Sequence, residues 1–185
     1  MAVLTSALWT WSNALTTLRL IAAPFFFCAL LGDAAGLAAL LFWGAVATDV
    51  ADGRVARARG ETSAFGGLLD HSTDAGFVSL GLAALAMKGI VPVALPVLVV
   101  AAFVQYVLDS KSLAGRELRA SFLGRWNGIL YFVPLGVVAT RGVLGTHWPG
   151  DRALEIAGML LITSTLISMA DRAFALVRGS TKPSS

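Results

Sequence analysis

The chain has 185 residues, of which 57% are hydrophobic and only 14% are charged, and its formal net charge is +3 at pH 7. A mean hydropathy of +0.77 excludes an ordinary soluble domain and is typical of a membrane protein with several spans. The single cysteine, Cys28, lies in an apolar run, so the chain has no disulfide framework.

Six apolar runs follow one another along the chain, each close to the roughly 20 residues that a helix needs to cross a bilayer. They lie near residues 13–31, 35–52, 64–87, 89–108, 123–143 and 153–177. The predicted fold class is therefore an all-α integral membrane protein with six transmembrane helices. We expect residues 1–178 to form a single membrane domain and residues 179–185 to be a polar, disordered tail.

Prolines and polar connections interrupt this pattern. We expect the four prolines within the apolar runs to kink helices rather than to end them, namely Pro24, Pro92, Pro96 and Pro134. The longer polar connections are predicted over residues 53–62 and 109–122.

Lysine and arginine are distributed unequally between the two sides of the predicted membrane domain. One side receives Arg54, Arg57, Arg59, Lys111, Arg116, Arg119, Arg125, Arg172, Arg178 and Lys182. The other side receives Lys88, Arg141 and Arg152. Because positive loops stay inside, the first set and both termini are predicted to be cytoplasmic. The sequence isoelectric point of about 9.5 then reflects the inner face of a membrane protein and not nucleic-acid binding.

One segment carries five of the eleven acidic residues of the chain, and four of them are the aspartates of the pattern D-x2-D-G-x2-A-R-x8-G-x3-D-x3-D. In helices, Asp49 and Asp52 share one face, and Asp70 and Asp74 share another. Carboxylates between apolar runs are costly and indicate a functional site. Four such charges at close range need compensation, for which divalent cations are the usual choice. The bland alternative is that the four aspartates only pair with the arginines between them.

This segment resembles the motif of the CDP-alcohol phosphotransferases, membrane enzymes of phospholipid biosynthesis, at all eight defined positions. The resemblance implies transfer of a phosphatidyl group from CDP-diacylglycerol to an alcohol acceptor with release of CMP. It also implies a multi-pass protein of the cell (inner) membrane with a cytoplasmic active site, contact with membrane lipids, and a homodimer.

The resemblance also implies roles for individual residues. Two divalent ions, Mg2+ or Mn2+, would be held by Asp49, Asp52, Asp70 and Asp74, and Asp74 would also be the general base. The donor nucleotide would be bound by Thr48, Asp52, Gly53, Ala56, Arg57 and Gly66. Gly53 would allow close backbone approach, and Arg57 would form a planar fork with phosphate oxygens.

A second resemblance lies upstream, where N-x-L-T-x2-R-x4-P runs from Asn13 to Pro24. It is similar to the opening of phosphatidylglycerophosphate and cardiolipin synthases, except that Ser12 replaces the usual proline. Two interpretations stay open for these residues. Asn13 and Thr16 would cap the first helix while Arg19 either reaches donor phosphates or snorkels to the membrane surface.

The acceptor is predicted from a basic loop that faintly resembles that of phosphatidylglycerophosphate synthases. Its candidate binding residues are Lys111, Arg116, Arg119 and Arg125. Cations beside the metals suit a phosphate-bearing acceptor, with glycerol 3-phosphate the first choice. The positive-inside rule alone also explains this loop.

His71 and Ala75 differ from the residues usual in the glycerophosphate branch. This difference favours inositol phosphate, serine or a lipid as alternative acceptors. His71 either faces the site or is hydrogen-bonded within the bundle. From other functional classes, an ion or proton transporter and a catalytically silent scaffold are the rival hypotheses.

Overall fold

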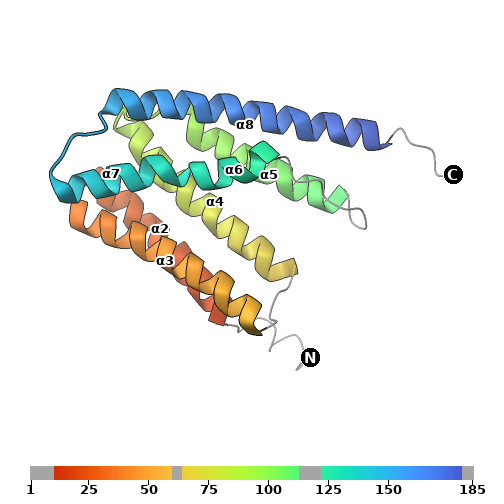
Figure 1. Cartoon of the computed structure of the whole chain (residues 1–185), viewed down its shortest axis with the longest axis horizontal. Coiled ribbons are helices and arrows are strands. Elements are labelled where there is room, and N and C mark those ends of the chain that lie inside the picture. Colours follow the sequence, from red (N-terminus) through yellow and green to blue (C-terminus); the bar gives the residue numbers. More distant parts are fainter. Residues whose placement is uncertain (1–10, 60–63, 113–121, 181–185) are drawn as a thin grey trace.

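The structure is a computed structural model and describes residues 11–59, 64–112 and 122–180, with side chains over 14–51, 67–109 and 122–175 (Figure 1). These residues form seven helices and no strand. The helices are α2 (Trp11–Leu31), α3 (Ala35–Arg59), α4 (Ala64–Met87), α5 (Ala94–Ser112), α6 (Phe122–Leu130), α7 (Phe132–Leu144) and α8 (Asp151–Ser180).

The helices make six passes, because α6 and α7 together form one broken rod (Figure 1). Pro134 is the third residue of α7 and has no N–H for the carbonyl of Leu130, so the helical hydrogen bonding is interrupted at Tyr131. The predicted all-helical fold with six apolar passes is confirmed. Consecutive passes alternate in direction, and the end at which α3 ends and α4 begins is called here the motif end.

Three segments are long and apolar enough to cross a bilayer, namely Ala14–Leu31, Phe122–Leu144 and Asp151–Ala175. Two shorter apolar helical segments, Ala35–Ala51 and Ala94–Asp109, lie in α3 and α5. The remaining pass, α4, carries two of the motif aspartates in its first half.

Two sequence-based boundaries were wrong. Helix α3 continues to Arg59, so residues 53–59 are helical where a polar connection was expected. Alanine and arginine favour helix strongly enough to offset the single Gly53. Helix α8 reaches Ser180 and includes the first two residues of the expected tail, while residues 181–185 lie outside the described part.

The prolines behave differently from one another. Pro24 lies inside α2 as expected. Pro92 lies in the turn before α5, and Pro96 is in the first turn of α5, so the expectation that both kink a helix was wrong. A missing N–H costs nothing in a first turn, because those groups have no partner within the helix.

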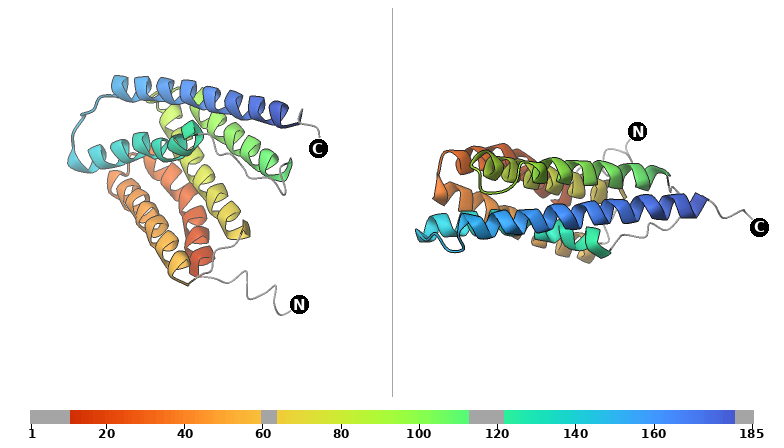
Figure 2. Two further views of the ribbon diagram at one scale, coloured as in Figure 1. Left: turned by 45° about the vertical axis from the view of Figure 1, so that its right-hand side comes forward. Right: turned by 90° about the horizontal axis from the view of Figure 1, so that it is seen from above.

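The apolar core lies where α2 is packed between α3 and α4 (Figure 2). The rings of Phe26 and Phe77 stack with centroids 4.8 Å apart, and Phe42 adds a tilted ring 6.0 Å from Phe26. Gly81 lets Phe26 and Leu135 approach, because a Cβ at Gly81 would lie 2.8 Å from Phe26 Cε1 and 2.9 Å from Leu135 Cδ2. Three helices therefore meet at one residue without a side chain.

Ion pairs hold the loops at the end opposite the motif. Lys88 after α4 pairs with Asp33 after α2 and donates to the carbonyl of Leu30 over 3.0 Å. Arg141 of α7 pairs with Asp151, the first residue of α8. This end of the bundle is closed by side chains of opposite charge.

Candidate metal and phosphotransfer site

Three of the four motif aspartates converge on one atom of α2. Nη1 of Arg19 lies 3.0 Å from Oδ1 of Asp49 and 3.2 Å from Oδ1 of Asp70, and it donates a hydrogen bond to Oδ1 of Asp74. The Arg19 side chain is 1% exposed, whereas those of Asp49, Asp70 and Asp74 are 47%, 35% and 27% exposed. The cation is thus the deep member of the cluster, and the carboxylates reach the surface.

Helix packing dictates this arrangement. On α2, Arg19 shares a face with Ala23 and Phe26, which are buried in the core. On α4, Asp70 and Asp74 precede Phe77 on one face in the same way. When the phenylalanines stack, the preceding turns of the two helices must also face each other. The charged cluster is therefore an extension of the apolar contact between α2 and α4.

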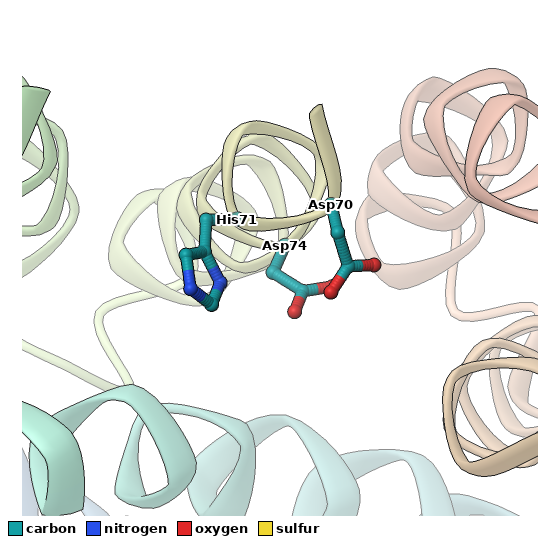
Figure 3. Close-up of side chains that lie close together, drawn as sticks. All are labelled: Asp70, His71 and Asp74. Atoms are coloured by element: carbon teal, nitrogen blue, oxygen red, sulfur yellow. The ribbon is translucent and has the colours of Figure 1, made fainter. Parts of the chain in front are cut away.

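Figure 3 shows the carboxylates of Asp70 and Asp74 side by side, with His71 turned to another side of α4. One ligand atom from each of these three residues lies within 4.8 Å of the others. His71 is exposed and packs edge-on against Tyr106, with ring centroids 5.8 Å apart. Of the two interpretations of His71, its place beside the carboxylates and in the lining of the adjacent cavity favours the one in which it faces the site.

The donor set fits a divalent cation. Asp49 comes from α3, and Asp70 and Asp74 come from α4, so that oxygens from two helices meet at one place. Hard cations such as Mg2+ and Mn2+ prefer oxygen ligands of this kind. Asp52 lies one turn beyond Asp49 on α3, but its side chain is outside the described ones.

A cavity of about 460 Å3 borders Asp74 on the side away from α3 and lies among α4, α5, α6 and α8. Its charged lining residues Asp74, Arg125 and Arg172 lie near the motif end, together with His71 and Tyr106. Asn127 and Ser168 add polar groups, and farther from that end the hydroxyls of Tyr131 and Thr165 are hydrogen-bonded 2.6 Å apart within otherwise mainly apolar walls. The cavity therefore suits a molecule with an anionic end near Asp74.

Sequence reasoning missed one charged residue of this cavity. Arg172 of α8 was counted only as a cytoplasmic charge, yet its guanidinium lies over the Tyr106 ring at 5.5 Å from the centroid. It also packs on Gly124, where a Cβ would lie 2.5 Å from Arg172 Nη2 and 2.9 Å from the Ser168 hydroxyl. No local motif marks Arg172, because its neighbours come from α5 and α6.

The remaining predicted residues fall into two groups. Thr48 is half-buried on α3, and its hydroxyl donates to the carbonyl of Ala45 over 2.9 Å. Arg125 is exposed at the cavity. The others are helical but without described side chains (Asp52, Gly53, Ala56, Arg57, Gly66 and Lys111), or lie outside the described residues altogether (Arg116 and Arg119).

The N-terminal residues correct two expectations. Asn13 and Thr16 lie within α2, which already includes Trp11, so they do not cap its start. Arg19 does not snorkel, because its guanidinium is buried against carboxylates.

The family model of the CDP-alcohol phosphatidyltransferases matches residues 9–170, which include the aspartate cluster and almost all of the cavity lining. The chain belongs to this family. None of the curated proteins matches the chain. Members of the family are membrane-bound transferases that move a substituted phosphate from a CDP-alcohol to an alcohol, and they use a divalent metal. The protein is thus an enzyme of phospholipid head-group chemistry, which decides against the transporter and scaffold hypotheses.

Proposed function

We propose that the protein transfers the phosphatidyl group of CDP-diacylglycerol to glycerol 3-phosphate and releases CMP, at the cytoplasmic face of the cell membrane. The observation that carries this proposal is the place of Asp74. Its carboxylate belongs both to the cluster of Asp49 and Asp70 and to the lining of the cavity with Arg125 and Arg172. A donor on one side and an acceptor on the other would meet at this residue.

The four motif aspartates would have two roles, cation binding and proton transfer. Asp49, Asp52, Asp70 and Asp74 would hold two Mg2+ or Mn2+ ions, which when bound neutralise charge on the diphosphate. Asp74 would also take the proton of the acceptor hydroxyl. The acceptor oxygen then forms a bond to the β-phosphorus, while the bond from that phosphorus to the oxygen of CMP breaks.

The donor would lie along the first half of the motif. There Arg57 would bind phosphate oxygens as a planar fork, and the small Gly53 and Ala56 would leave room for the nucleotide, with Thr48 beside them and Gly66 of α4 contributing from the second half. On α3, residues 48, 49, 52, 53 and 56 fall within little more than two turns. The proposed cation ligands and nucleotide contacts would then follow each other along one helix.

The acceptor would occupy the cavity. A phosphomonoester carries close to two negative charges, which Arg125 and Arg172 would neutralise as charge-assisted hydrogen-bond donors. Arg172 thus joins Lys111, Arg116 and Arg119, which the sequence assigned to the acceptor. His71, which departs from the glycerophosphate branch, also lines the cavity. Inositol phosphate, serine or a lipid are therefore the alternative acceptors.

An acceptor panel tests the proposal. The purified protein in lipid nanodiscs receives CDP-diacylglycerol, Mg2+ or Mn2+, and one acceptor at a time, and both CMP and the lipid product are measured. We expect the fastest turnover with glycerol 3-phosphate and none with a chelator present. Efficient use of serine together with no use of glycerol 3-phosphate would refute the acceptor and leave the phosphotransfer chemistry intact. A homodimer is a further expectation, which the mass of the protein in nanodiscs would check.

A further inference from the structure

One feature of the site is not explained by substrate binding. Nη1 of Arg19 lies at the point on which Oδ1 of Asp49, Asp70 and Asp74 converge. We propose that Arg19 is the resident counter-ion of the metal-free site, and that a divalent cation must displace its guanidinium from these carboxylates in order to bind. This inference rests on the proposed metal dependence.

The geometry supports displacement rather than coexistence. A divalent cation such as Mg2+ holds carboxylate oxygens at about 2.0–2.1 Å, whereas Nη1 keeps Asp49 and Asp70 at 3.0 and 3.2 Å. One nitrogen atom carries two hydrogens, so it cannot donate to all three carboxylates at once. The three oxygens therefore surround Nη1 as they would surround a cation, and they cannot close around an ion while Nη1 remains.

The charges support the same conclusion. Asp49, Asp70 and Asp74 come from two helices that pack against α2, and without a cation their mutual repulsion would separate those helices. Arg19 supplies the compensating charge from within the protein, since its side chain is buried and the carboxylates are partly exposed. A cation enters from the exposed side, where the carboxylates face solvent. The guanidinium then gives up these three carboxylates and can donate to an anion beside the site.

A purely structural role for Arg19 predicts the opposite response to its removal. If Arg19 only positions the carboxylates, its loss must weaken both the fold and cation binding. If Arg19 competes with the cation, its loss must destabilise the metal-free protein and strengthen cation binding. The two measurements move in opposite directions only if Arg19 competes with the cation for these carboxylates.

The experiment compares Arg19→Gln with the parent in the absence of any substrate, with Mn2+ as the probe. Thermal unfolding is followed with and without Mn2+, and the Mn2+ Kd is measured by calorimetry and by the free-ion electron spin resonance signal. We expect the metal-free Tm of Arg19→Gln to fall by several degrees and its Mn2+ Kd to fall at least tenfold. The control is Lys88→Gln, which removes the ion pair with Asp33 between the turns that follow α4 and α2, at the end opposite the carboxylates. It should lower the Tm and leave the Mn2+ Kd unchanged.

A second variant keeps the test decisive if Arg19→Gln does not fold without metal. Arg19→Lys retains a positive charge on a side chain without the planar fork, and we expect its Mn2+ Kd to fall by a few-fold. An unchanged or raised Kd in the folded variant overturns the inference. If the parent binds Mn2+ and releases CMP while the variants bind no more tightly, only the displacement fails. If the parent binds no Mn2+ and turns over in a chelator, the proposed function fails with it.

Discussion

The contact between α2 and α4 has two halves that meet different requirements. In one half Phe26 and Phe77 stack in a fully buried core, and in the other, two turns away, Arg19 faces Asp70 and Asp74. The apolar half gains from close packing alone, because lipid is as apolar as its side chains. The charged half is held by opposite charges that a substrate or metal can take over. The same two helices thus carry a rigid apolar contact and, two turns along, a charged contact whose partners can be replaced.

The largest effect is expected in the charged half, on activity. Asp74→Asn keeps the shape of the side chain but cannot accept the proton of the acceptor, so CMP release should fall by roughly 10²- to 10⁴-fold. Its control is Asp171→Asn, which changes an exposed aspartate of α8 that lies outside the cavity lining. Initial rates at saturating Mg2+ and CDP-diacylglycerol measure both. Full activity of Asp74→Asn would contradict the role of this carboxylate.

The next effect is expected in the apolar half, on stability. Phe26→Ala leaves a cavity between Phe77 and Phe42, and we expect the free energy of unfolding to fall by roughly 2 kcal/mol. This is less than the about 3–5 kcal/mol typical of soluble cores, because transfer from protein to lipid removes no apolar surface from water. Phe25→Ala, beside it on α2 but 60% exposed, should change little. Denaturant titration in detergent micelles measures both, and equal losses would place the core elsewhere.

A pair of glycines on α4 sharpens the distinction. Gly81→Ala introduces a methyl group against the fully buried side chains of Phe26 and Leu135, and overpacking of this kind typically costs about 1–3 kcal/mol. Gly76→Ala meets no atom within 4 Å and should stabilise by up to about 1 kcal/mol through helix propensity. Opposite signs of the change in unfolding free energy are the expected result. A loss in both variants would show that α4 is restrained along its whole length.

The smallest effect concerns the cavity beside the carboxylates. Gly124→Ala pushes the Arg172 guanidinium away from its place between Gly124 and Tyr106. If that guanidinium binds the acceptor, the acceptor KM should rise roughly fivefold, equivalent to about 1 kcal/mol or one hydrogen bond. The KM for CDP-diacylglycerol should stay near that of the parent. Steady-state kinetics with each substrate varied in turn provide the measurement, and an equal rise in both constants would indicate a general distortion.

The sequence predicts what is local and leaves out what depends on helix docking. Six apolar passes and two facing pairs of aspartates follow from hydropathy and from spacings of three and four residues, and the structure confirms the passes and brings Asp49, Asp70 and Asp74 together. The partner of these carboxylates is Arg19, about thirty positions before Asp49, and its position depends on how α2 packs. One signal was present in the sequence, since Arg19 is a cation placed within an expected span.

The cavity was harder to predict than the carboxylates. The sequence directed attention to the basic loop before Arg125, because clustered cations are visible in a linear chain. Arg172 is isolated in the sequence of α8. Its role in the cavity is visible only when α5 and α6 pack against α8 and bring Tyr106 and Gly124 to it. Likewise, the proline in α7 signals a kink, but not that the break would bring a tyrosine hydroxyl to α8.

That break has a consequence for how such an enzyme changes its acceptor. Tyr131, bonded to Thr165, lies at the part of the cavity remote from Arg125 and Arg172, so on the proposed assignment it limits how far an acceptor extends from its phosphate. The volume of the side chain at position 131 would then determine the length of acceptor that fits the cavity. A lineage could lengthen or shorten its substrate by a substitution at the break and leave the aspartates, the donor site and the bundle as they are.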